Sequence, residues 1–351
     1  MSAPRQPAID VLKVLASQLI VLHHLSAYGP VADAVEAALP GLIAWLYNHG
    51  RTAVQVFLVL GGYLAVQPLM RAMSGPMSTL ARAILARYLR LVPPFAAALA
   101  LAVLAAAWAA PWLDEDLLAP APQALQVLAH LLLIHEWLDV GSLSAGVWYV
   151  AIDFQLYALM AGLLWLGLRS GRAWIAIAWV LGMAAASLLL WNRQPELDDW
   201  AIYFFGAYGL GAAAHWTQMS ASGQVRWIWL VGMVALTALA LLLDFRLRIA
   251  VALATALFLV ATGIQQPRLS AGLARWLGSL GRTSYALFLV HFPVLLIGNA
   301  WWARADLNGP LAGCATFIAI WAGSLALAWG FERWIEAPLA RHLRLAAHRR
   351  A

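Results

Sequence analysis

Residues 173–191 read AWIAIAWVLGMAAASLLLW, a run of apolar and small residues without a single Asp, Glu, Lys or Arg. About 20 such residues are needed for an α-helix to cross the hydrocarbon core of a bilayer. A helix is also the structure that satisfies all of its own backbone polar groups where no water is present. This stretch therefore predicts a membrane-spanning helix.

The rest of the chain is also rich in apolar residues and poor in charged ones. Of its 351 residues, 64% are hydrophobic and 11% are charged, whereas soluble domains carry about 25% charged residues. So few charges cannot cover a water-exposed surface, which excludes a soluble protein with a large core. Tryptophan, whose amphipathic ring suits the membrane interface, stands at the ends of many apolar runs. Examples are Trp45, Trp112, Trp148, Trp200, Trp227 and Trp276.

We expect one all-α membrane domain over residues 1–351, with about ten spanning helices in one bundle and no appended soluble domain. The expected spans are 8–28, 50–69, 88–112, 146–168, 173–191, 200–216, 227–243, 248–264, 283–302 and 311–332. The first is interpreted as a retained helix, because Lys13, His23 and His24 interrupt the apolar run of a cleavable signal peptide. Residues 123–138 are apolar but contain two histidines and a glutamate, so we interpret them as a short interfacial or re-entrant helix.

The charges orient this arrangement. With the N-terminus inside, the inner segments hold 17 of the 22 Lys and Arg residues, which fits the positive-inside rule. The outer segments hold the other five, namely Arg51, Arg193, Arg246, Arg248 and Arg304. Both termini are therefore expected in the cytoplasm. An eleventh span at 123–138 would put the basic C-terminal tail outside. The same distribution explains the basic pI without nucleic-acid binding.

Two polar residues of the first span share one face. Lys13 and His24 are 11 residues apart, close to three full helical turns, which separates them by about 16 Å along the axis. A cation at one level and a general base at another suit a long phosphorylated substrate that lies along the helix. The alternative is a snorkelling lysine and a histidine that only packs between helices. His23 points about 100° away and ranks below His24.

Other polar residues also require an explanation, because such groups are costly inside a membrane. Arg87 and Arg90 share a helix face and suit phosphate binding, although any inner loop attracts arginine. Asp153 lies in a predicted span, where it can orient an imidazole, hold a cation, or form an internal salt bridge with Arg51 or another base. His291 either lines a cavity or packs in the core. Gly61 and Gly62 favour close helix approach.

In order along the chain, these segments resemble the acyltransferase-3 family of bacterial membrane O-acyltransferases. The resemblance rests on IDVLK at 9–13 followed by ten residues and His24, VFLVLGGYL at 56–64, RYLRLVP at 87–93, WYVAIDFQLY at 148–157, SYALFLVHFP at 284–293 and EAP at 336–338. Three positions depart from the family pattern: Lys13 replaces the commoner Arg, Asp153 replaces Glu, and Gly61 stands where Ser is frequent.

The resemblance implies an enzyme of the bacterial inner membrane that transfers an acyl group, most often acetyl, from cytoplasmic acyl-CoA to a hydroxyl of a cell-envelope or exported glycan. It implies a general base or acyl relay at His24, which Asp153 orients. We expect the donor phosphates near Lys13, Arg87 and Arg90, and no metal. The acceptor is expected to contact Arg51, Trp148, Tyr149 or His291.

A proton-coupled transporter of a glycan or small metabolite is the alternative function. About ten helices with a buried carboxylate and intramembrane histidines suit such a protein. Transporters, however, commonly show repeated halves and broken helices at corresponding positions, and neither is visible in this chain.

Overall fold

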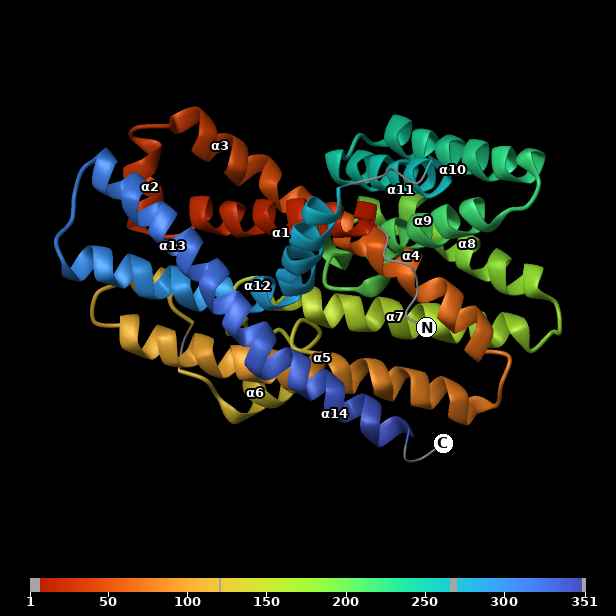
Figure 1. Ribbon diagram of the computed structural model, residues 1–351, viewed down its shortest axis with the longest axis horizontal. Coiled ribbons are helices and arrows are strands. Elements are labelled where there is room, and N and C mark those ends of the chain that lie inside the picture. The colour runs from red at the N-terminus through yellow and green to blue at the C-terminus, as the bar shows by residue number, and fades with distance from the viewer. Residues whose placement is uncertain (1–6, 120, 266–269, 349–351) are drawn as a thin grey trace. The chain divides into compact units, whose positions relative to one another are not determined.

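The computed structural model describes residues 7–119, 121–265 and 270–348. Arg5, Arg268, Arg349 and Arg350, which contribute to the expected orientation, lie outside these ranges. The described residues form fourteen α-helices and no strand. The helices are α1 Pro7–Ala27, α2 Pro30–Glu36, α3 Pro40–His49, α4 Val54–Ala72, α5 Met77–Ala109, α6 Ala124–Leu131, α7 Val147–Leu168, α8 Ala173–Leu189, α9 Ala201–Met219, α10 Gly223–Leu243, α11 Leu247–Gln265, α12 Ala271–Arg304, α13 Pro310–Phe331 and α14 Ala337–His348 (Figure 1).

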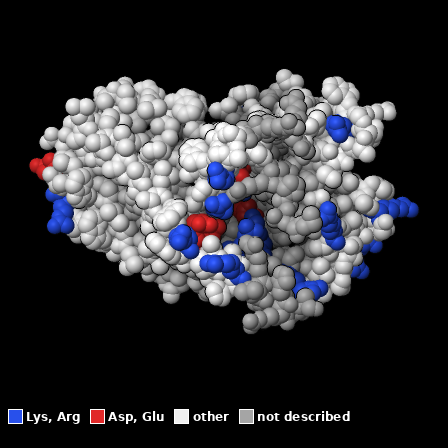
Figure 2. Space-filling view, in the orientation of Figure 1, with Lys and Arg blue, Asp and Glu red and all other residues white. Residues whose placement is uncertain are grey.

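Nine helical stretches within the described ranges are long and apolar enough to cross a membrane. Figure 2 agrees with this, because large areas of the visible face carry no Lys, Arg, Asp or Glu side chain. The chain is therefore a multi-pass membrane protein. The predicted span 200–216 forms α9, which is a helix but is not among the nine. Its residues include His215, Thr217 and Gln218, and nearly all of it is buried.

Residues 123–138 do not form a spanning helix, as expected. Only Ala124–Leu131 are helical, and turns follow. Eight residues at 1.5 Å each give about 12 Å, well short of the roughly 30 Å of a hydrocarbon core. Elsewhere the sequence underestimated helix length: α5 begins at Met77 rather than near residue 88, and it continues through Pro93 and Pro94.

The chain folds into two compact units. The first comprises Met1–Leu12, Val54–Tyr88 and Ala151–Leu277, and the second comprises Lys13–Ala53, Leu89–Val150 and Gly278–Ala351. In the first unit, α9 packs against α4, α8, α10 and α11. In the second unit, α13 packs beside α2 (Figure 1).

Two glycines allow the close contact between α4 and α9 in the first unit. A Cβ atom added at Gly62 would lie closer than 3.0 Å to the backbone carbonyl oxygen of Tyr208 on α9. A Cβ at Gly211 would make an equally short contact with the backbone carbonyl oxygen of Val59 on α4. The backbones of the two helices therefore touch directly, which agrees with the packing role predicted for the Gly61-Gly62 pair.

Arg246 joins the ends of two helices in the first unit. Its guanidinium donates hydrogen bonds to the backbone carbonyls of Leu188, near the end of α8, and Ala240, near the end of α10, both at 3.1 Å. It also donates to the Asn192 side chain at 2.7 Å and to the Asp244 carbonyl at 3.1 Å. Carbonyls in the last turn of a helix have no intrahelical partner, and Arg246 supplies a donor to the Leu188 carbonyl, while the Ala240 carbonyl also accepts from the Asp244 backbone N–H at 3.2 Å.

We expect Arg246→Met to lower the free energy of unfolding by about 3 kcal/mol, because the Leu188 carbonyl and the buried Asn192 side-chain oxygen lose their Arg246 donor. Arg246→Lys should restore part of the loss. Thermal unfolding of the purified protein in detergent measures the effect. The control is Arg193→Met, since Arg193 is exposed and its replacement should change stability by less than about 0.5 kcal/mol. Equal losses in the two variants would contradict this role.

Candidate active site

The second unit brings His24 of α1 against His291 of α12. His24 Nδ1 lies 2.6 Å from His291 Nε2, and the ring planes are inclined by only 4°. His291 is fully buried, whereas His24 is partly exposed. The pair therefore consists of a histidine that is only partly exposed and a fully buried one that supports it.

The surrounding carbonyls determine the tautomers of both rings. His291 Nδ1 faces the backbone carbonyl of Phe288 at 2.8 Å and that of Leu287 at 3.1 Å, so Nδ1 carries the proton and donates. His291 Nε2 is then an acceptor, and His24 Nδ1 must donate to it. The lone pair of His24 Nε2 consequently remains available. This nitrogen can accept a proton or attack a carbonyl carbon.

Gly146 brings the loop before α7 close to this pair. It has φ +80°, a left-handed conformation that favours glycine. A Cβ at this position would lie 3.1 Å from the Phe288 ring and 3.5 Å from His24 Cε1. The Phe288 ring in turn contacts the rings of Tyr149, at 5.2 Å between centroids, and His291, at 6.2 Å. Aromatic rings and the backbone of Gly146, which has no side chain, therefore lie close to the histidine pair.

For Asp153 the structure shows one of the alternatives that the sequence left open, a salt bridge with a base other than Arg51. In the first unit its carboxylate forms an ion pair with Arg87, with 2.5 Å between Oδ2 and the guanidinium nitrogen. The Arg87 guanidinium also lies over the Tyr157 ring, 5.2 Å from its centroid. The side chain hydrogen-bonded to His24 is His291, and the orienting role expected of Asp153 stays a prediction. Arg87 likewise has a carboxylate partner, which leaves its expected role in donor binding a prediction.

Lys13 and Arg90 lie near acidic residues of the second unit. Glu336 is within electrostatic range of Lys13, Arg90 and Glu332. It ends a π-helical turn, Glu332–Glu336, and its Oε2 atom is buried without a hydrogen-bond partner. π-Helical turns occur frequently at functional sites. α1 runs without a break from Pro7 to Ala27, so the predicted separation of about 16 Å along the helix between Lys13 and His24 holds.

The remaining expected residues lie at different places. Tyr149 reaches the Phe288 ring next to the histidine pair, and Trp148 packs edge-on against Tyr149. Arg51 is exposed in the short turn Gly50–Ala53. His23 Nδ1 lies 3.2 Å from the Leu46 carbonyl oxygen. No group of three or more His, Cys, Asp or Glu that could hold a metal occurs in the part of the chain that the structure describes.

Sequence reasoning missed Gly146, Phe288 and His130. Phe288 precedes His291 by three residues, so one helical turn of spacing was an available signal. His130 supports the loop that carries Gly146. Its Nδ1 donates to the Gln126 carbonyl at 2.8 Å, and its Nε2 accepts from the Leu143 backbone N–H at 3.2 Å. Its side chain is buried and stacks on His135 at 4.0 Å between centroids.

This arrangement predicts acid sensitivity. Burial, with a smaller contribution from the neighbouring His135, lowers the pKa of His130 from 6.5 to about 4. A folded-state pKa below the unfolded value stabilises the protein above about pH 6.5, and this stabilisation is lost as pH falls toward 4. We therefore expect the melting temperature to fall over this range. His130→Gln should show a smaller pH dependence and a loss of about 1–3 kcal/mol at pH 7.

Melting curves at half-unit pH intervals measure this effect. The control is His49→Gln, because His49 is exposed and its replacement should leave the pH profile unchanged. If His130→Gln retained the full pH dependence of the wild type, the acid sensitivity would not originate at His130.

No curated protein and no solved structure matches the chain significantly. A family model described as an acyltransferase domain matches residues 6–330, nearly the whole chain. This range contains His24, His291 and every other residue discussed for the site except Glu332 and Glu336. The protein therefore belongs to this family of acyltransferases, as a multi-pass membrane member.

Proposed function

We propose that this membrane acyltransferase moves an acyl group, in the first instance acetyl, from acyl-CoA to a hydroxyl of a cell-envelope or exported glycan. The observation that carries the proposal is the unshared Nε2 of His24, oriented by His291. A neutral imidazole with one nitrogen anchored and the other accessible has the arrangement that a general base requires.

In the direct route, His24 Nε2 accepts the proton of the acceptor hydroxyl while the hydroxyl oxygen attacks the thioester carbonyl. The C–S bond then breaks, and the proton passes from Nε2 to the departing thiolate, which leaves as CoA thiol. In the relay route, Nε2 itself attacks the thioester, the C–S bond breaks, and CoA leaves as the thiolate. The hydroxyl then attacks the acyl-imidazole, the bond from the acyl carbon to Nε2 breaks to restore the neutral imidazole, and the hydroxyl proton passes to the CoA thiolate. His291 supports either route, because it accepts the Nδ1 hydrogen bond while charge develops on the His24 ring.

In this proposal the donor phosphates bind near Lys13 and Arg90. Lys13 and His24 stand at opposite ends of the same stretch of α1. In the structure, Glu336 lies near these cations. Phosphate groups would replace this carboxylate as the partner of Lys13 and Arg90, because charge-assisted hydrogen bonds to phosphate are strong. The distribution of basic residues supports a cytoplasmic donor side and location in a bacterial inner membrane.

The test uses the full-length protein in membranes supplied with acetyl-CoA labelled in the acetyl group. We expect label in the glycan fraction together with an equal amount of free CoA thiol, and neither product in membranes without the protein. Purified protein should also bind CoA. A proton-coupled transporter would release no CoA thiol and would instead move solute when a pH gradient is applied. That result would overturn the proposal.

A further inference from the structure

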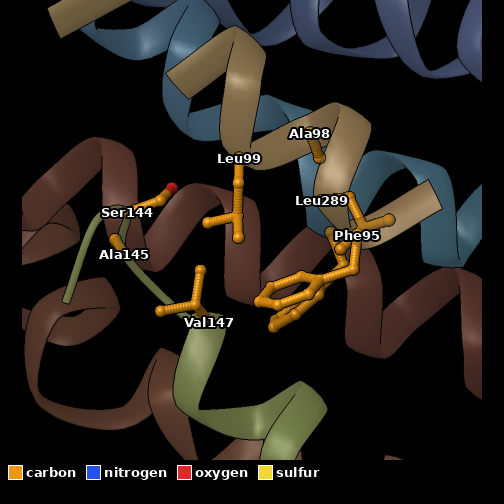
Figure 3. Close-up of a pocket in the computed structure, with 8 residues that line it drawn as sticks. Phe95, Ala98, Leu99, Ser144, Ala145, Val147 and Leu289 are labelled. Atoms are coloured by element: carbon orange, nitrogen blue, oxygen red, sulfur yellow. The ribbon is translucent and has the colours of Figure 1, made fainter. Parts of the chain in front are cut away.

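A small apolar pocket lies in the second unit beside the histidine pair. Three segments contribute to it: α5, the loop that leads into α7, and α12. Figure 3 shows the side chains of Leu99 and Val147 pointing into the space between these segments, with the Phe95 ring beside them. The lining includes Phe95, Ala98, Leu99, Ser144, Val147 and Phe288. Among these six, only Ser144 has a polar side chain.

Two residues, Gly146 and Phe288, connect the pocket with the histidine pair. Gly146 stands between the lining residues Ala145 and Val147, and its missing side chain lets the loop lie against the Phe288 ring and His24 Cε1. Phe288 both lines the pocket and contacts the His291 ring. The Phe288 ring and the Gly146 backbone thus connect the apolar space with the histidine pair, although neither histidine lines the pocket itself.

The chemistry of a thioester indicates what this space can hold. The carbonyl carbon must lie near His24 Nε2 and the attacking hydroxyl, both of them polar. The hydrocarbon end of the acyl group points away from the carbonyl and is stabilised by an apolar surface. We propose that the pocket lined by Phe95, Leu99, Val147 and Phe288 binds the hydrocarbon end of a short acyl group and limits its length. This assignment rests on the proposed function.

Two substitutions on α5 change the size of the pocket in opposite directions. Leu99→Ala removes a side chain that points into it, and Ala98→Val adds two methyl groups to a buried lining residue. A methylene that fits or fails to fit an apolar pocket changes specificity about 10-fold or more. The matched control is Leu104→Ala, because Leu104 lies on the same helix with 66% of its side chain exposed.

The experiment measures kcat/KM for acetyl-, butyryl- and hexanoyl-CoA in each variant, with rates normalised to the amount of folded protein. We expect Leu99→Ala to raise the hexanoyl-to-acetyl ratio at least about 10-fold. Ala98→Val should lower the butyryl-to-acetyl ratio by a similar factor, and Leu104→Ala should leave both ratios unchanged.

The outcomes separate this assignment from the proposed function. If the wild type transfers acetyl but neither ratio moves in Leu99→Ala and Ala98→Val, the pocket does not hold the acyl group, and the proposed function stands. If one variant fails to fold, the other decides by the same criterion. If the wild type transfers no acyl group from any of the three donors, the proposed function fails and this assignment fails with it.

Discussion

His24→Ala is expected to lower the rate of acyl transfer by at least about 100-fold, because general base catalysis contributes about 100- to 10,000-fold. In the acyl-imidazole route the loss is larger, since the nucleophile itself is removed. The fall should occur in kcat, with the KM for acyl-CoA nearly unchanged, because the expected donor-binding residues Lys13 and Arg90 remain. Labelled acetyl transfer in membranes, normalised to the amount of folded protein, measures it.

His291 variants test the tautomer argument within the same assay. His291→Leu removes the acceptor for His24 Nδ1–H, so His24 loses its orientation, and we expect a rate at least about 10-fold below that of the wild type. His291→Gln keeps a side-chain acceptor and should lose less activity. Both variants should still bind CoA, which separates misorientation of His24 from loss of the donor site.

Two neighbouring histidines are the controls. His49→Ala should retain full activity, because His49 is exposed on α3. His23→Ala removes the side chain that lies near the Leu46 carbonyl and should reduce activity only as far as it reduces the amount of folded protein. If His24→Ala kept normal activity while His23→Ala lost it, the assignment of the base would be wrong.

Gly62→Ala is expected to have the largest effect on folding. Its new Cβ would collide with the Tyr208 backbone carbonyl oxygen, and a backbone atom cannot move aside as a flexible side chain can. The helices α4 and α9 would have to separate, which exposes the tightly packed surface between them. We expect a loss of about 3 kcal/mol or more in the free energy of unfolding. Thermal unfolding and the yield of monodisperse protein in detergent measure the loss.

Gly232→Ala is the matched control. Gly232 lies within α10, and a Cβ at this position would meet no atom within 4 Å. Alanine is favoured over glycine in a helix by about 1 kcal/mol, so this variant should be as stable as the wild type or slightly more stable. Equal stability of Gly62→Ala and Gly232→Ala would contradict direct contact between the backbones of α4 and α9.

Most of the helices were predictable because each apolar run carries its own signal. The run 173–191 coincides with α8 and the short turn that follows it. The beginnings of α5 and α12 were not predictable, because their first turns contain arginines and polar residues that resemble a loop in sequence. These residues are helical in the structure.

The candidate site was predictable in part. His24 stood out as an imidazole on the same face of the first span as Lys13, and in the structure its Nδ1, not its Nε2, faces His291. Its orienting partner was assigned to Asp153 because the sequence offered a carboxylate at a similar depth in the membrane. Asp153 forms a salt bridge with Arg87, which was the other interpretation of this carboxylate. The pocket beside His24 had no sequence signal, because its lining residues are ordinary apolar side chains from three separate segments.

The sequence by itself determined that the chain is helical and crosses a membrane repeatedly, because long apolar runs have no other stable structure in lipid. It also supplied the histidines and the ordered segments typical of an acyltransferase. Only the tertiary structure decided which side chain orients His24. The partner, His291, lies 267 residues away along the chain. Local periodicity places a residue on a helix face, whereas contacts between distant helices depend on how the whole unit packs.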